Sequence, residues 1–215
     1  MIIDIFLIVL LFSIFAFSHS FLASSRIKNE LIKNIGEKIA FYRFFYNFIS
    51  IILFLVFYFL SPKPDILIYD LHYPFDIVTF VAQVISFGGL IWSLKGIDLK
   101  EFAGISQIIR FLRNEYKIED ADAKESFRIN GAGRYVRHPV YFFSILFLGL
   151  RPSMDLFYFV TFICAVIYFY VGSIYEEKKL AEKFGTAYLE YQKHVPRLFP
   201  YKIFFKKESK IFQEK

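Results

Sequence analysis

Long apolar runs leave this chain few possible folds. Three runs come close to the length of a transmembrane helix and a fourth is fully adequate: Ile5–Leu22, Phe44–Leu60, Ile77–Leu94 and Met154–Tyr175. A helix needs roughly 20 apolar residues to cross the hydrocarbon core of a membrane. Hydrophobic residues make up 56% of the chain, more than the share of about half in soluble domains. The sequence therefore predicts an all-α, polytopic integral membrane protein.

A fifth apolar run, Val140–Leu150, is too short to cross a membrane alone. Arg151 and Pro152 end it. Together with Met154–Tyr175 it predicts a C-terminal helical hairpin whose first arm is either short or extends back towards Tyr135. A short arm would be partly re-entrant, which is tolerated only where protein shields its backbone. We therefore expect about five transmembrane helices.

The charged residues of the loops predict the orientation of the chain. Basic residues follow the first run, separate the third from the fourth, and follow the last, whereas the loop Ser61–Asp76 carries three aspartates against one lysine. Cytoplasmic loops are enriched in Lys and Arg. With five crossings, every basic stretch lies on one side of the membrane. This places the C-terminus in the cytoplasm and the N-terminus outside, across the cell membrane if the chain is prokaryotic.

We expect one membrane domain, residues 1–215, in four parts. Residues 1–95 would form three spanning helices, 96–134 a cytoplasmic interfacial region, 135–200 a core hairpin with its cap, and 201–215 a basic tail. Apolar residues of the interfacial region recur at helical spacing, at Phe102, Ile105, Ile108, Ile109 and Leu112. This pattern predicts an amphipathic helix along the membrane surface.

Composition argues against two other kinds of site. The net charge of +6 could attract nucleic acid, but the basic residues lie beside apolar runs, as expected of cytoplasmic loops, so we expect no nucleic-acid partner. The single cysteine, Cys164, excludes a cysteine metal site, and His19, His72 and His194 are scattered without metal-binding spacing. We expect membrane lipids as partners and no metal, and the oligomeric state stays open.

Two charged motifs bracket the C-terminal hairpin. Arg137, His138 and Pro139 stand at its start, and the pair Glu176 and Glu177 follows its second arm. Arginine and histidine at a membrane boundary are either interfacial anchors or part of a site. The two glutamates either pair with Lys179, Lys183 or a loop arginine, or bind a cationic group of a ligand.

These motifs resemble a known family. The pattern G-x-x-x-Y-x-RHP-x-Y, an apolar hairpin, and then EE-x-x-L-x-x-x-F-G-x-x-Y-x-x-Y-x-x-x-V-P-x-x-x-P run from Gly131 to Pro200. The stretch resembles the C-terminal core of integral-membrane methyltransferases, which include isoprenylcysteine carboxyl methyltransferase and phospholipid methyltransferases. HSFLASSRIK (His19–Lys28) and YRFFYN (Tyr42–Asn47) are more similar to the nurim and methanethiol S-methyltransferase branch. Gly133 departs from the family, which usually has Tyr or Phe there.

The resemblance implies a pocket for S-adenosylmethionine at the cytoplasmic face. Its residues would be Arg137, His138, Tyr141, Glu176 and Glu177, and less directly Tyr135, Tyr188 and Tyr191. Arg137 suits the carboxylate of the cofactor, either glutamate suits the ammonium, and aromatic faces suit the adenine or the sulfonium. Arg137 and His138 are the catalytic candidates. His138 would either accept a proton or only hydrogen-bond the cofactor.

The resemblance also predicts the reaction, which is methyl transfer to a small or lipophilic thiol such as methanethiol. A prenylcysteine carboxyl or phospholipid acceptor is the alternative within the enzymes. A nurim-like membrane protein without activity is the alternative outside them. A small transporter would have inverted repeats and ionisable residues in the middle of the membrane, neither of which the sequence contains.

Overall fold

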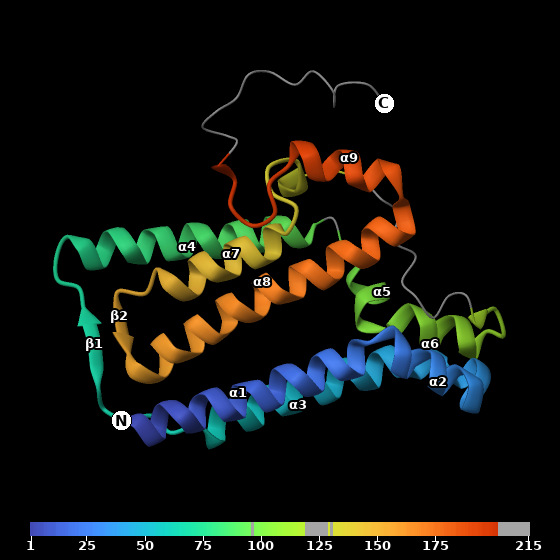
Figure 1. Ribbon diagram of the computed structural model, residues 1–215, viewed down its shortest axis with the longest axis horizontal. Helices are drawn as coiled ribbons and strands as arrows, with labels where there is room; N and C mark the ends of the chain where they lie inside the picture. Colours follow the sequence, from blue (N-terminus) through green and yellow to red (C-terminus); the bar gives the residue numbers. More distant parts are fainter. Residues whose placement is uncertain (96, 119–128, 130, 202–215) are drawn as a thin grey trace. The chain divides into compact units, whose positions relative to one another are not determined.

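The computed structural model describes residues 1–95, 97–118, 129 and 131–201, and Figure 1 traces them. They divide into two compact units. The first contains residues 1–76, 97–126 and 152–165, and the second contains 77–96, 127–151 and 166–215. The basic tail expected over 201–215 lies outside the described residues except for Tyr201. Helices dominate both units, which confirms the all-α fold.

The first unit begins with an antiparallel helical pair. Helices α1 (Ile2–Ala23) and α3 (Tyr42–Leu60) lie side by side, joined through α2 (Ser25–Ile35) and the 3-10 helix η1 (Gly36–Phe41) (Figure 1). Their aromatic side chains pack edge to face, as between Phe12 and Phe57, whose ring centroids lie 5.4 Å apart. Aromatic packing of this kind joins the two apolar helices along their length.

Polar side chains within this pair satisfy one another. The Nε2 atom of His19 lies 2.8 Å from the hydroxyl of Tyr46. Its Nδ1 atom lies 2.9 Å from the hydroxyl of Ser50, which itself donates to the carbonyl of Tyr46. Hydrocarbon supplies no hydrogen bonds, so polar groups of a spanning helix must find partners within the protein. His19 therefore joins α1 to α3.

The expected interfacial helix is broken in two. Helices α5 (Leu99–Ala103) and α6 (Ile105–Leu112) meet at Gly104, which has a left-handed φ of +85°. A Cβ atom at Gly104 would lie 2.6 Å from the backbone nitrogen of Phe44, so the corner sits directly on the start of α3. The predicted apolar face is present, and its outermost residue, Leu112, is 70% exposed. Four of the five residues that predicted a helix lie on α6, and Phe102 lies on α5. Apolar spacing does not reveal the tight corner between them.

A small antiparallel sheet was not predicted from the sequence. Strand β1 (Leu67–Asp70) pairs with β2 (Ser153–Asp155), with Tyr69 opposite Met154 and a bulge between Leu67 and Tyr69. The pairing joins the loop after α3 to the turn that precedes α8 (Leu156–Phe184) (Figure 1). Both connections therefore lie at the same end of the first unit.

The second unit contains the motifs. Helix α4 (Phe75–Leu94), from Ile77 onwards, packs against α7 (Pro139–Gly149) through Gly89, where a Cβ atom would lie 2.2 Å from the ring of Phe143 (Figure 1). The amide of Gln83 donates to the carbonyl of Phe147 at 2.9 Å. The unit also contains the 3-10 helix η3 (Gly131–Arg134), the C-terminal part of α8, and α9 (Thr186–His194). Gly185, with φ of +57°, separates α8 from α9.

Four stretches of the described residues are long and apolar enough to cross a membrane: Ile2–Ala23, Ser25–Leu60, Phe75–Leu94 and Leu156–Phe184. These stretches support an integral membrane protein. Helix α7 begins at Pro139 and does not extend back to Tyr135, so the first arm of the hairpin is the short one. Eleven residues rise only about 16 Å, about half of the hydrocarbon core. The expected count of five full crossings is therefore not confirmed.

The corner at Gly104 provides a test of the first unit. Replacing Gly104 with Ala should lower the free energy of unfolding by about 1–2 kcal/mol from the left-handed backbone alone, and further because the new methyl group would meet the backbone of Phe44. Thermal unfolding of the protein in detergent micelles measures the loss.

Gly88 is the matched control, because a Cβ atom there meets nothing within 4 Å and alanine favours a helix interior. Gly88→Ala should leave the unfolding temperature unchanged or raise it. A Gly104→Ala variant as stable as Gly88→Ala would contradict the tight corner.

Candidate functional site

The two charged motifs meet in the second unit. Arg137 and His138 directly precede α7, whose first residue is Pro139, a position that suits proline because its missing N–H would be unpaired there. The N–H of Arg137 donates to the carbonyl of Pro196 at 2.9 Å, and the N–H of His138 donates to that of Arg197 at 3.1 Å. The segment after α9 therefore holds the start of α7 in place.

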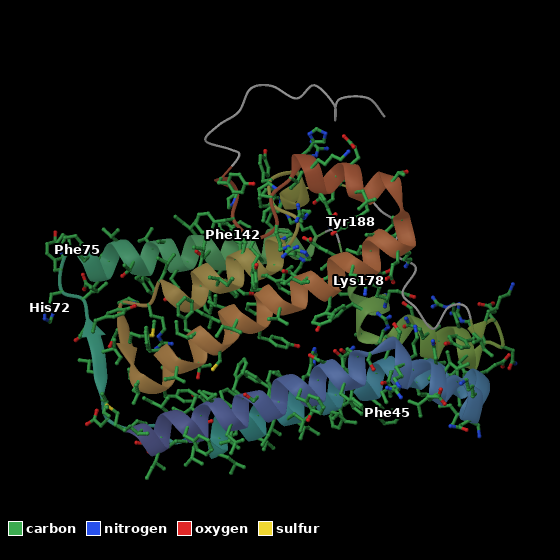
Figure 2. All side chains as sticks on the ribbon, in the orientation of Figure 1. Phe45, His72, Phe75, Phe142, Lys178 and Tyr188 are labelled. Carbon is green, nitrogen blue, oxygen red and sulfur yellow. The ribbon has the colours of Figure 1, made fainter. Side chains whose placement is uncertain are left out.

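Aromatic packing strengthens this attachment. Phe142, which Figure 2 labels on α7, packs edge-on against Phe199 with 5.7 Å between ring centroids. Elements that the sequence separates by more than fifty residues are thereby joined beside the charged motifs. The end of α8, where Glu176 and Glu177 lie, completes the arrangement.

Glu177 is the centre of the charge cluster. Its side chain is only 3% exposed. Its Oε1 accepts from Nε of Arg137 at 2.7 Å and faces Nε2 of His138 at 3.2 Å. Its Oε2 accepts from Arg137 at 3.1 Å, Gln192 at 3.1 Å and Arg197 at 2.9 Å. A carboxylate offers about four acceptor sites, so these five donors saturate it. Glu177 thus pairs with arginines outside the helices, one of the alternatives left by the sequence.

Arg137 uses all three of its nitrogens within the protein. Besides Nε and Nη2 on Glu177, its Nη1 donates to the carbonyl of Gln192 at 2.9 Å and to that of Val195. These carbonyls lie at the C-terminal end of α9, where a cation is favoured by the helix dipole and the last carbonyls lack helical partners. Its side chain is 10% exposed. Arg137 therefore fastens α8 and α9 to the segment before α7.

Glu176 differs sharply from its neighbour. Its side chain is 48% exposed. Its Oε2 accepts a hydrogen bond from the hydroxyl of Tyr141 at 3.0 Å and lies 3.4 Å from Nδ1 of His138. Glu176 is the half-exposed acid of the cluster and can reach a ligand without breaking the contacts of Glu177.

His138 lies between the two acids. Its side chain is 6% exposed, and each ring nitrogen faces a carboxylate, Nε2 that of Glu177 and Nδ1 that of Glu176. Only the imidazolium form donates from both nitrogens. Burial by itself lowers the pKa of His138, but the hydrogen bonds and charges of Glu176 and Glu177 outweigh it, and the pKa lies above its ordinary value. This geometry favours a charged bridge over a proton acceptor.

An aromatic stack lies beside Glu176. The ring of Tyr141 is nearly parallel to that of His138, with 5.2 Å between centroids and 5° between planes. It is also nearly parallel to Phe169 of α8, at 4.9 Å and 14°. The Tyr141 hydroxyl is held by Glu176. The site therefore combines a carboxylate with aromatic faces, the two groups that bind organic cations in proteins.

Tyr188 and Tyr191 are the buried residues of α9 and pack next to the site. Tyr188, labelled in Figure 2, is 2% exposed, and Tyr191 donates from its hydroxyl to the carbonyl of Gly133 at 2.6 Å. Burial raises the pKa of both tyrosines, that of Tyr191 to about 12, so both are neutral. Tyr135 is 46% exposed and packs beside Trp92 instead. These three tyrosines differ in position from Tyr141, which contacts the acids.

Sequence reasoning missed Gln192 and Arg197. Arg197 occupies the first variable position of the V-P-x-x-x-P pattern, so an arginine inside the family pattern was the available signal. Its guanidinium bonds Glu177 and lies 5.9 Å from the ring of Tyr170. Among the described residues, no group of three or more His, Cys, Asp or Glu side chains could hold a metal ion.

Removing the central acid should unfold the cluster. Glu177→Gln leaves Arg137 and Arg197 without their carboxylate, and breaking a buried ion pair costs about 3–5 kcal/mol. Glu176→Gln changes a half-exposed group and should cost less than about 1 kcal/mol. Thermal unfolding in detergent compares the two variants, and equal losses would contradict the central position of Glu177.

The charge of His138 should make stability depend on pH. The pKa of His138 is raised in the folded protein above the ordinary 6.5. The stability that charged His138 contributes is therefore fully present below a pH of about 6.5, and it is lost as the pH rises through the folded pKa. The unfolding temperature should therefore fall as the pH rises through this range, and His138→Gln should remove the part of that fall that is due to His138. An unchanged decline would show that another group causes it.

Comparison with known proteins places the chain beside two bacterial relatives. It is 27% identical over 196 residues to methanethiol S-methyltransferase 1 of Bradyrhizobium diazoefficiens, covering 90% of this chain and 66% of the relative. It is 33% identical over 100 residues to methanethiol S-methyltransferase of Pseudomonas deceptionensis, covering 46% of this chain and 36% of the relative.

The chain thus spans just under two thirds of the first relative and about a third of the second. No family model matches the chain, and no solved structure matches it. The two matches confirm the resemblance to integral-membrane methyltransferases and make this chain a relative of proteins named methanethiol S-methyltransferase.

Proposed function

We propose that this chain is an integral-membrane methyltransferase that moves a methyl group from S-adenosylmethionine to a small thiol, with methanethiol as the simplest acceptor. The observation that carries the proposal is the similarity to methanethiol S-methyltransferase 1, which extends over 90% of the chain. The second unit supplies chemistry that suits this activity, because it combines a half-exposed acid, stacked aromatic rings and an excess of arginine donors.

The side chains around Glu176 fit the chemical groups of S-adenosylmethionine. Its ammonium suits the half-exposed carboxylate of Glu176, and its adenine or sulfonium suits the faces of the Tyr141 stack. We assign Glu177 and Arg137 to holding the site together, since both are occupied within the protein. Tyr188 and Tyr191 pack α9 in place, and Tyr135 lines only the outer part of the proposed pocket.

The chain's own contribution to methyl transfer is position and exclusion of water. S-adenosylmethionine supplies, when bound, a methyl group on a positively charged sulfur. The thiolate form of the acceptor is the nucleophile. In the proposed reaction the thiolate would take the methyl group, and the electron pair of the broken carbon–sulfur bond would stay on the sulfur of the cofactor. The thiol proton goes to solvent, because both nitrogens of His138 face carboxylates. We therefore propose that His138 orients Glu176 and is not the base.

We further propose that the charge cluster lies at the cytoplasmic face. The basic residues around both motifs support this orientation. Helix α8 begins beside β2 and reaches Glu176 after roughly 30 Å, which is about the thickness of the hydrocarbon core. In this orientation, the N-terminus lies outside and the C-terminus lies in the cytoplasm.

Product formation tests the proposal directly. The purified chain in detergent, supplied with S-adenosylmethionine and methanethiol, should release dimethyl sulfide, measured by gas chromatography of the headspace. Glu176→Gln should lower the rate by about 10²-fold, since charge-assisted bonds to a ligand contribute roughly 1.5–3 kcal/mol each. Glu190→Gln is the matched control, because Glu190 lies on α9 in the same unit and pairs with Lys193 at the surface.

The choice of acceptor separates the alternatives. If the chain methylates a prenylcysteine carboxyl or a phospholipid and leaves methanethiol unchanged, the acceptor is lipophilic and the thiol proposal is wrong. Failure of the chain to bind S-adenosylmethionine or to methylate any of these acceptors would overturn the proposal and leave a nurim-like protein without activity.

A further inference from the structure

Two arginines contact Glu177, and they differ in what else they do. Every nitrogen of Arg137 is used within the protein, and its side chain is 10% exposed. Among the described residues, Arg197 gives only Nη2 as a side-chain donor, to Glu177, and its side chain is 31% exposed. Its Nε is buried without a hydrogen-bond acceptor among the described residues. A buried donor without an acceptor is costly and calls for an explanation.

Of the donors around Glu177, Arg197 is the one whose loss would leave the carboxylate best satisfied. Glu177 faces five donors although its two oxygens provide about four acceptor sites. Arg137 alone already contacts both oxygens. The two arginines balance Glu176 and Glu177 in formal charge, and a protonated His138 adds one positive charge. The cluster therefore has a cation available for an anion.

The position of Arg197 is set by its surroundings. Its carbonyl accepts from the N–H of His138, and its guanidinium lies 5.9 Å from the centre of the Tyr170 ring. His138 in turn contacts Glu176. The guanidinium bonds Glu177, and His138 contacts both Glu177 and Glu176, so the guanidinium and the half-exposed carboxylate belong to one cluster. This arrangement suits a ligand that carries an anion and a cation close together.

We infer that Arg197, and not Arg137, binds the α-carboxylate of S-adenosylmethionine, while Glu176 binds the neighbouring ammonium. The inference rests on the proposed function and adds the residue that recognises the amino-acid end of the cofactor. A guanidinium fits a carboxylate with two parallel hydrogen bonds. The side chain of Arg197 is 31% exposed and only its Nη2 contacts Glu177 among the described residues, so the exposed part of the guanidinium provides the donors, and Arg137 remains a positioning residue.

A pair of ligands isolates this contact. Decarboxylated S-adenosylmethionine keeps the ammonium, the sulfonium and the adenosine, and lacks only the carboxylate. Equilibrium binding of both ligands to the full chain in detergent gives the ratio of the two dissociation constants. The parent should prefer the intact ligand by about tenfold or more, because charge-assisted hydrogen bonds are among the strong ones.

Arg197→Gln should bind the decarboxylated ligand as the parent does and should lose the preference for the intact one. Arg134→Gln is the matched control, since it removes the same charge from an exposed position in the same unit and should keep the preference. Unchanged preference in Arg197→Gln, or no preference in the parent, would overturn the inference while leaving the proposed function intact.

If Arg197→Gln binds neither ligand, Arg197→Lys serves instead, because it keeps a positive charge beside Glu177. Lysine is a point charge and cannot provide paired donors, so the preference should fall at least threefold while the decarboxylated ligand still binds. A parent-like preference in Arg197→Lys would overturn the inference. Failure of the parent to bind either ligand would overturn the proposed function itself.

Discussion

The carboxylate of Glu177 is the interaction on which the second unit depends. A buried charge is expensive in a low-dielectric environment unless it is paired and fully hydrogen-bonded. Here the donors come from the start of α7, from α9 and from the segment that follows it, so satisfying one carboxylate requires all of these elements to be in place. The same bonds bring residues 137 and 197, which are far apart in the sequence, to one point.

The adjacent acid has a different environment for a simple geometric reason. Successive residues of an α-helix point about 100° apart, so two neighbouring glutamates cannot face the same side of α8. Glu177 faces inward to the arginines, whereas Glu176 is half-exposed beside Tyr141. A repeated acid in the sequence thus separates into one residue that holds the structure and one that is available to a ligand. His138 joins the two, since each of its nitrogens faces one acid.

Much of the fold could be predicted from the apolar runs. They located α1, α3, α4 and α8, and Pro139 marked the start of α7. The sheet β1–β2 and the break at Gly104 could not be predicted. Strands of three and four residues have too short a pattern to detect, and the break depends on contact with Phe44, a residue distant in the sequence.

The candidate site divides in the same way. From the sequence, the resemblance to the methyltransferase family implied that Arg137, His138, Tyr141, Glu176 and Glu177 line one pocket, and charged residues at the ends of apolar helices need partners or a function. Only the tertiary structure decided which charged side chain is paired within the protein and which stays accessible to a ligand. That choice separates Glu177 from Glu176 and Arg137 from Arg197, and it depends on which donors the α9 region brings to each oxygen. Hydrogen-bond partners are set by positions in space, and residue types alone do not specify them.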